Sequence, residues 1–215
     1  MRSLILRLIA AYVVVVTGVL WGGDSYVRSM LPGYAVVIER LLPEWRITNL
    51  NLDRLNQEPV IQVTVRLVEP LPVGGQRLPP GGEITASTLK GHALQHPLVL
   101  YPIVLSWPGL WRRAGLIRLG ISVPLLLAVE GLDVPLVLVG SVEDLVLANL
   151  APDQLNHSLS VRWMHTMNGG GRLALALAAA WASIAFGRWM DIRYASGATV
   201  PRAVPCRSDR GADRG

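Results

Sequence analysis

Residues 112–140 read RRAGLIRLGISVPLLLAVEGLDVPLVLVG, and this stretch decides the fold class. It opens with Arg112, Arg113 and Arg118 and continues as a long apolar run in which Glu130 and Asp133 are the only acids. Arginines gather in the cytoplasmic loops of membrane proteins, close to the ends of their spans. The stretch therefore predicts a membrane span whose first residues face the cytoplasm.

Arginines also border the first and the last apolar runs of the chain. Arg2 precedes the run 4–20 and Arg7 lies near its start, and Arg188 and Arg193 follow the final one. By the same positive-inside rule, both chain ends are expected in the cytoplasm. The sequence thus predicts a multi-pass protein of the bacterial inner membrane with its N- and C-termini inside.

The composition agrees with a membrane environment and excludes several partners. Hydrophobic residues make up 51% of the 215 residues, charged residues 16%, and the mean hydropathy is +0.40. This is too apolar for a typical soluble domain of this length. The basic residues are spread singly and form no single stripe, so we expect membrane lipids and no nucleic acid as partners. Cys206 is the only cysteine, which excludes an intramolecular disulfide and a cysteine metal site.

The expected fold is membrane α+β, with about four transmembrane helices and a small antiparallel β-rich extracytoplasmic domain. The first apolar run is expected to stay as an uncleaved signal anchor, because no small-x-small cleavage site follows it. The expected segments are an anchor 1–22, an outer domain 23–91, a second span 92–111, a cytoplasmic loop 112–118, a third span 119–140, an outer segment 141–170, a fourth span 171–188 and a disordered cytoplasmic tail 189–215.

The clearest strand pattern lies in the outer domain, where apolar and polar residues alternate over 61–67. Alternation with a period of two buries one face of a strand and leaves the other wet. Partner strands are expected at 47–52, before a turn at 56–57, and at 83–89, after a Pro/Gly-rich loop. The sequence therefore predicts an antiparallel meander.

Three strands alone are marginally stable, so this meander needs a cover. A helix over 26–42 or the membrane is expected to supply it. The helix should be broken at Pro32 and Gly33, because proline removes a helical hydrogen bond.

The segment after Leu119 has two interpretations. Either one span carries Glu130 and Asp133 near its outer end, or the span stops at Glu130 and residues 134–140 return as a strand of the outer domain.

Residues 141–170 are then expected to complete the outer domain. Ser141 starts a short helix that ends before Pro152. Alternation over 159–163 predicts a further half-buried strand.

Two histidines, His92 and His96, have the i, i+4 spacing that can place two metal ligands on one helical face. No glutamate lies between them, and Pro97 disfavours a helical conformation at His96. We therefore expect hydrogen-bonded polar ends at the membrane interface, and neither a zinc protease nor a bound metal. A carboxylate from the outer domain remains a possible third ligand.

Glu130 and Asp133 are three residues apart and share a face if the segment is helical. Carboxylates at membrane depth are costly and suggest proton relay or catalysis. The alternative, favoured by Gly131 and Pro135 nearby, is that both acids mark the outer end of the span. Intramembrane aspartyl proteolysis needs acids on two helices and is not expected.

The run Gly169-Gly170-Gly171 before Arg172 lacks the Lys-Ser/Thr pair of a phosphate-binding loop. It is interpreted as a flexible entry to the last span, with Arg172 at headgroup level, where an anionic lipid or a partner carboxylate is a plausible ligand. Cys206 lies in the tail and no Gly-x-Ser-x-Gly elbow occurs. No catalytic residue, cofactor or small-molecule substrate is therefore inferred.

Several segments in order resemble the exosortase H-associated membrane proteins of Gram-negative bacteria. They are His96-Pro97, Tyr101-Pro102, Trp107-Pro108, Glu130-Gly131-Leu132-Asp133-Val134-Pro135, Trp163-Met164-His165 and Asn168 to Arg172, within residues 92–185. The resemblance implies an inner-membrane companion of a sorting transpeptidase, with catalysis carried by that partner. It also adds His165 to the candidate functional residues.

The expected role is thus a non-catalytic accessory protein of an exosortase-type surface-protein sorting system. One alternative is an intramembrane enzyme or proton-coupled translocator that uses His92, His96, Glu130 and Asp133. Another is an assembly factor of an envelope secretion machine, docking through the β-rich domain.

Overall fold

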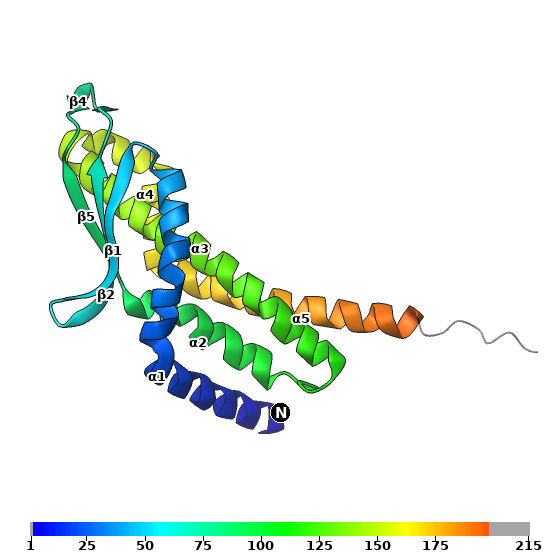
Figure 1. Ribbon diagram of the computed structural model, residues 1–215. Coiled ribbons are helices and arrows are strands. Elements are labelled where there is room, and N and C mark those ends of the chain that lie inside the picture. The colour runs from blue at the N-terminus through cyan, green and yellow to red at the C-terminus, as the bar shows by residue number, and fades with distance from the viewer. Residues whose placement is uncertain (1, 198–215) are drawn as a thin grey trace, which may run out of the picture.

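A computed structural model describes residues 2–197 of the chain, in which long helices surround one face of a small sheet (Figure 1). In chain order the elements are α1 (Arg2–Leu41), β1 (Trp45–Leu55), β2 (Glu58–Leu67), β3 (Leu71–Val73), β4 (Gln76–Leu78), β5 (Glu83–Leu89), α2 (Lys90–Ser106), α3 (Arg113–Leu150), the 3-10 helix η1 (Pro152–His157), α4 (Leu159–Thr166), the π-helical turn η2 (Met167–Gly171) and α5 (Arg172–Gly197).

Three helical segments among the described residues are long and apolar enough to cross a membrane. They are Ser3–Leu41 in α1, Arg113–Leu150 in α3, and Leu159–Arg193, which joins α4, η2 and α5. Helix α2 has 17 residues, about 26 Å at about 1.5 Å per residue, against roughly 30 Å of hydrocarbon. The membrane character and the small antiparallel sheet are as expected, whereas the count of four spans is not confirmed.

Helix α1 runs without interruption through the boundary expected at residue 22 and through Pro32. The expected break at Pro32 and Gly33 is therefore wrong. Both residues lie on an exposed side of the helix, as does Arg28, whose carbonyl loses its donor to the proline ring. Tyr34 on the opposite side is buried in the main core. Packing of that side outweighs the lost hydrogen bond.

The predicted meander is confirmed, with antiparallel strand order β1-β2-β5. Ile61, Val63, Val65 and Leu67 of β2 are all buried, as their alternation indicates. The two residues between β1 and β2, at 56–57, both have positive φ angles, which is the conformation of a tight hairpin turn. A second hairpin, β3–β4, forms within the Pro/Gly-rich loop.

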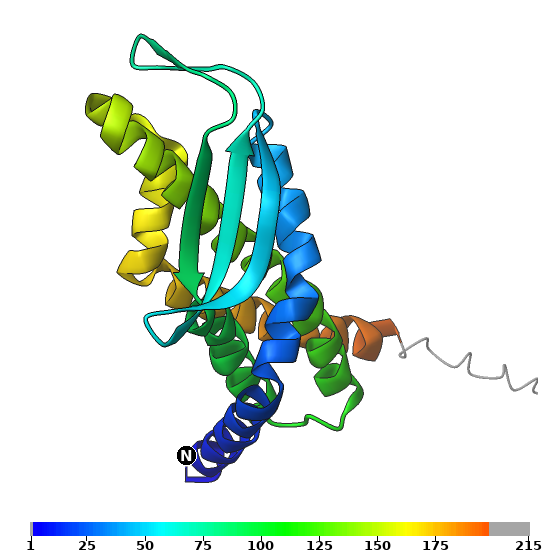
Figure 2. The same ribbon diagram turned by 60° about the vertical axis from the view of Figure 1, so that its left-hand side comes forward.

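The buried face of the sheet packs against α1 and α3, which pass behind the strands in Figure 2. The shared core includes Val63 of β2, Ala86 of β5, Ile38 of α1 and Leu138 of α3. Burial of apolar area between sheet and helices supplies the stability that three strands lack alone. The expected helical cover is thus present, with α3 as its second half.

Helix α3 decides between the two interpretations of residues 119–140. It is one continuous helix of 38 residues, with Pro124 and Pro135 inside it. Residues 134–140 are therefore helical, and the strand alternative is wrong. The expected loop 112–118 is also mostly helix, since α3 begins at Arg113, and the short helix expected from Ser141 is the last part of α3.

The strand expected over 159–163 is wrong, because these residues form helix α4. Ser158 caps the helix by accepting a hydrogen bond from the Val161 backbone N–H at 3.2 Å. Val161 and Met164, three residues apart, are buried against α3, while Leu159 is 79% exposed. A five-residue alternation is too short to distinguish a strand from one helical face.

Helix α5 continues beyond the end expected for the last span at residue 188. The tail expected to be disordered from residue 189 is helical as far as Gly197. Trp189 contacts Phe186 with ring centroids 5.3 Å apart, and the Arg193 guanidinium lies 4.3 Å from the Trp189 centroid. These contacts stabilise the extra turns. Cys206 and the rest of the expected tail lie outside the described residues.

Candidate functional site

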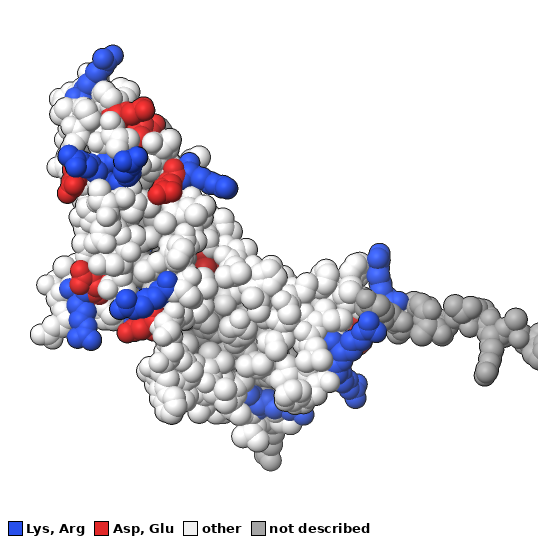
Figure 3. Space-filling view, in the orientation of Figure 1, with Lys and Arg blue, Asp and Glu red and all other residues white. Residues whose placement is uncertain are grey.

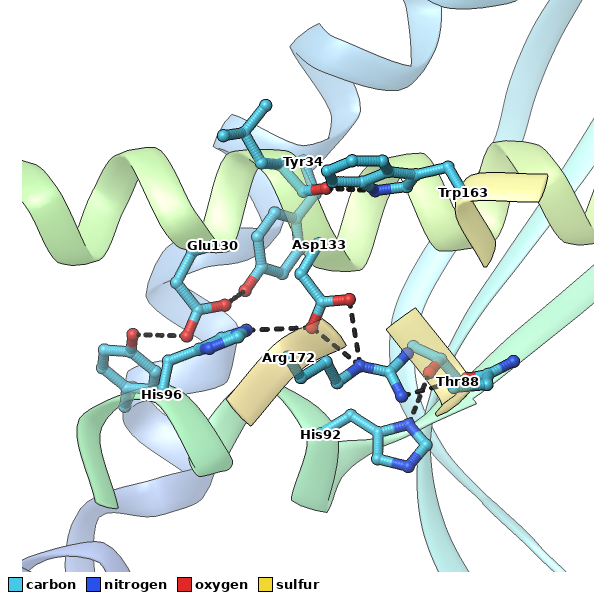
Figure 4. A network of polar contacts seen from close by, with 11 residues as sticks. Tyr34, Thr88, His92, His96, Glu130, Asp133, Trp163 and Arg172 are labelled. Carbon is cyan, nitrogen blue, oxygen red and sulfur yellow. Dashed lines mark hydrogen bonds and ion pairs between the residues drawn. The ribbon is translucent and has the colours of Figure 1, made fainter. Parts of the chain in front are cut away.

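Asp133 of α3 is the centre of a buried polar cluster, shown in Figure 4. The Arg172 Nε of α5 lies 2.9 Å from its Oδ1 and 2.8 Å from its Oδ2. The His96 Nε2 of α2 lies 2.9 Å from Oδ2. Asp133 and His96 are 0% exposed and Arg172 is 3% exposed. Three helices therefore meet at one carboxylate, which has partners on both oxygens.

Glu130, one turn earlier on α3, has its partners on α1. The Tyr26 hydroxyl donates to its Oε1 at 2.9 Å, and the Tyr34 hydroxyl donates to its Oε2 at 2.6 Å. Glu130 is 1% exposed. Each oxygen thus accepts a hydrogen bond inside the protein, as buried polar atoms require.

One further contact joins the cluster to η2, and another lies beside it at the end of the sheet. Arg172 Nη1 donates to Asn168 Oδ1 at 3.0 Å. Thr88, near the end of β5, contacts His92 Nδ1 through its hydroxyl at 3.0 Å. We call the residues Tyr26, Tyr34, His96, Glu130, Asp133, Asn168 and Arg172 the buried network.

The local sequence explains why the acids face inward. Glu130 and Asp133 are three residues apart, so a helix places them on one face, while Leu132 between them lies 45% exposed on another. Trp163 of α4 donates from its ring Nε1 to the Leu132 carbonyl at 2.8 Å. This contact holds α4 against the same turn of α3.

The helix does not end at the acids, because Gly131 and Pro135 lie within α3, which continues to Leu150. The inward face at this level packs against α1, α2 and α5, so the carboxylates are enclosed by protein. That the acids mark the outer end of the membrane span stays a prediction.

The side chain of His96 is fully buried and hydrogen-bonded to Asp133, and its backbone is helical, which contradicts the expectation from Pro97. Pro97 lies inside α2 and does not unwind the preceding turn. His92 is half-buried and contacts Thr88, outside the shell around the acids. His165 lies exposed on α4 and is not brought to the buried network.

Arg172 is buried, and its partner is a carboxylate of the same chain, where an anionic lipid or a carboxylate of a partner protein was expected. The glycines before it form a defined turn. Gly170 has a φ angle of 112°, a conformation that side chains other than glycine rarely adopt. The turn joins α4 to α5 and places Arg172 at the start of α5, facing Asp133.

The chemistry of the buried network follows from its charges and its enclosure. Arg172 supplies a positive charge beside Asp133, whereas Glu130 is held by two neutral tyrosine hydroxyls. Within residues 2–197, His96 Nδ1 and Arg172 Nη2 are buried atoms with no hydrogen-bond partner. No three His, Cys, Asp or Glu side chains in that range are placed to hold a metal ion. The arrangement can join helices and exchange protons internally, but its carboxylates present no surface to a substrate.

Sequence reasoning missed the tyrosines, Thr88 and Asn168. Tyr26 and Tyr34 are eight residues apart, close to two helical turns, which is a signal for one shared face. Asn168 precedes Arg172 by four residues, also a helical spacing. The pairing of these side chains with particular acids depends on the tertiary fold.

No protein-family model, curated protein or solved structure matches the chain.

Proposed function

We propose that this protein is a non-catalytic accessory protein of the bacterial inner membrane, acting in an exosortase-type surface-protein sorting system. The buried network fixes the helices and the attached sheet in one arrangement. The sheet presents a docking surface outside the membrane, and the spans contact the sorting enzyme within it.

The burial of both carboxylates carries the non-catalytic part of the proposal. A general acid or base must reach its substrate within hydrogen-bond distance. Asp133 and Glu130 are 0% and 1% exposed, and every one of their oxygens has a protein partner. This is the pattern of a structural cluster, in which Asp133 is paired with Arg172 and Glu130 accepts hydrogen bonds from two tyrosines.

The distribution of charge supports the orientation. In Figure 3 the groups near the α2–α3 loop and the end of α5 are mostly blue, whereas red and blue are mixed around the sheet. The positive-inside rule then places the α2–α3 loop in the cytoplasm and the sheet outside. Helix α3 rises about 23 Å from Arg118 to Asp133 at about 1.5 Å per residue, so the buried network lies in the outer half of a bilayer of roughly 30 Å.

Helix α2 is the fourth span in this arrangement. It packs against α1, α3 and α5 and carries the two histidines at its sheet end. Its 17 residues fall only a few residues short of a full crossing, and a short span is accommodated by local thinning of the bilayer.

The sorting partner is supported by the resemblance of residues 92–185 to exosortase-associated proteins. The test is copurification of the full chain after mild detergent extraction from cells that contain a sorting system. A sortase in the eluate is the expected result. Components of an envelope secretion machine without a sortase would instead support the assembly-factor alternative.

Proton-coupled translocation is the second candidate, favoured by one observation. His96 bonds to Asp133 through Nε2 and has a buried Nδ1 without a partner among the described residues, so it can exchange a proton with a second group. Proteoliposomes under an imposed pH gradient test this. Proton uptake that Glu130→Gln abolishes would favour the translocator, and no uptake above protein-free vesicles favours the accessory role.

A further inference from the structure

A basic hollow lies at the other end of the helices from the sheet. It has a volume of about 490 Å³. Its cationic lining comes from four separate parts of the fold: α1, the α2–α3 loop, α3 and α5 contribute one arginine each. These side chains are Arg7, Arg112, Arg118 and Arg188, and Asp191 is the one acid among the lining residues. Four positive charges against one negative charge leave the hollow at +3 (4 − 1).

Arg118 is the buried member of this group. It is 3% exposed, and its Nη2 donates to the Pro108 carbonyl at 3.1 Å. Its Nε is buried and has no hydrogen-bond partner within the described part of the chain, and no ion pair joins it to Asp191 there. A buried donor left without a partner is costly, so an anion that accepts a hydrogen bond from Arg118 Nε binds favourably.

The neighbouring helix makes room for this arginine. A Cβ atom on Gly187 of α5 would overlap the Arg118 side chain and lie 3.1 Å from the Ala114 carbonyl oxygen. Any larger residue at 187 would displace the arginine. The buried position of Arg118 therefore depends on a glycine on a different helix.

The hollow continues into apolar surface along α1 and α2. An adjoining hollow of about 460 Å³ shares Arg7, Trp107 and Arg112 with the first and adds Leu105 and Trp111. Next to it, a groove of about 390 Å³ is lined only by apolar and aromatic side chains from both helices, including Leu8, Ile9, Tyr12, Leu98 and Ile103. Arg7 and Leu8 are neighbours on α1, and Ile103 and Leu105 are two residues apart on α2, so the groove begins at the same ends of these two helices as the basic lining.

We propose that this region binds one anionic phospholipid, with its phosphate among the four arginines and an acyl chain in the groove between α1 and α2. Arginines recognise phosphate by paired, charge-assisted hydrogen bonds. Tryptophans beside them are typical of the headgroup level of a bilayer. The apolar groove favours a lipid over a free phosphate ion, because only a lipid has an acyl chain that can bind there. The inference needs only that α1 and α2 contact the bilayer, and it is independent of the sorting role.

Lipid binding to the full chain is measured by native mass spectrometry from detergent micelles, with phosphatidylglycerol and phosphatidylcholine as probes. We expect phosphatidylglycerol to bind the wild-type chain at least about tenfold more tightly. Both lipids carry a phosphate, but the choline cation of phosphatidylcholine adds a positive charge beside the four arginines of the hollow, and like charges repel. Arg118→Gln should remove most of this preference, and Arg46→Gln, at an exposed position on β1, should leave it unchanged. Equal binding of the two lipids, or a preference that survives Arg118→Gln, overturns the proposal.

Two further measurements keep the test decisive. If Arg118→Gln does not fold, the double variant Arg112→Gln/Arg188→Gln removes two charges and leaves Arg118 in place, and it should lower the preference severalfold. Competition with inorganic phosphate tells whether the hollow binds a lipid headgroup or a soluble anion. Displacement of phosphatidylglycerol by millimolar phosphate would show that the acyl groove contributes nothing, and would assign the hollow to a soluble anion.

Discussion

Arg172 Nε lies within hydrogen-bond distance of both carboxylate oxygens of Asp133, 39 residues earlier in the chain, and both side chains are almost completely buried. The pair joins the start of α5 to the middle of α3. Removing one partner from a buried ion pair leaves an uncompensated charge, which is far more destabilising than the loss of an exposed pair. The fold should therefore depend strongly on this contact.

The first prediction concerns this ion pair. Asp133→Asn leaves Arg172 buried without a counter-charge, and should lower the free energy of unfolding by about 3 kcal/mol. Chemical denaturation in detergent micelles measures the change. Asp153→Asn, at an exposed position on η1, is the matched control and should have almost no effect.

A double-mutant cycle separates the pair from its surroundings. The variant Asp133→Leu/Arg172→Leu removes both charges. Its loss in the free energy of unfolding should be about 2 kcal/mol smaller than the sum of the losses in Asp133→Leu and Arg172→Leu. Additive single effects would mean that the two side chains do not stabilise each other.

The tyrosines should differ in their contribution. Tyr34→Phe removes the 2.6 Å hydrogen bond to Glu130 at a buried position, and Tyr26→Phe removes the 2.9 Å bond at a half-buried one. Hydrogen bonds to charged groups contribute about 1.5–3 kcal/mol, so Tyr34→Phe should lower the free energy of unfolding more than Tyr26→Phe. Tyr12→Phe, 53% exposed near the start of α1, is the control. A larger effect from Tyr26→Phe would be inconsistent with the geometry.

Gly170 and Gly169 provide a matched pair for the turn before Arg172. A Cβ atom meets nothing within 4 Å at either position, but only Gly170 has a positive φ. Gly170→Ala should therefore lower the melting temperature through backbone strain of about 1–2 kcal/mol. Gly169→Ala should leave it nearly unchanged. Equal melting temperatures for the two variants would show that the stability of the fold does not depend on the positive φ of Gly170.

The orientation can be tested with single cysteines in a Cys206→Ser background. A membrane-impermeant maleimide should label Leu145→Cys, exposed near the end of α3, in intact spheroplasts. It should label Trp111→Cys, in the α2–α3 loop, only after permeabilisation. Val142→Cys is buried against the sheet and controls for access, since it should stay unlabelled. Labelling of Trp111→Cys in intact spheroplasts would contradict the proposed orientation, because it would place the α2–α3 loop outside the membrane.

The sheet was predictable because each strand carries its own local signal. In β2 the alternation continues for seven residues and determines the buried face, and the turn at 56–57 fixes the hairpin. In α4 the apparent alternation covers only five residues, and Ser158 decides for a helix by capping it. A short alternation also fits one or two turns of an amphipathic helix. Only a longer alternation, as in β2, therefore predicts a strand securely.

The acids of the site could be found from the sequence, but their environment could not. Glu130 and Asp133 stand out because charge is rare in apolar runs. Their partners come from α1, α2 and α5, up to 104 residues away, and no local pattern records such pairings. The same limit explains why Arg172 was placed at the membrane surface. Its burial follows from the turn at Gly170 and from the contact of α5 with α3.

The accessory role is tested most directly by sorting-signal processing in cells, normalised to the amount of inserted protein, for His96→Ala, Glu130→Gln and Asp133→Asn. A non-catalytic protein predicts that processing falls only as far as each variant's protein level falls, so that processing per inserted molecule stays at the wild-type value. A variant that inserts at the wild-type level and abolishes processing would contradict the account, because the buried network would then take part in the chemistry.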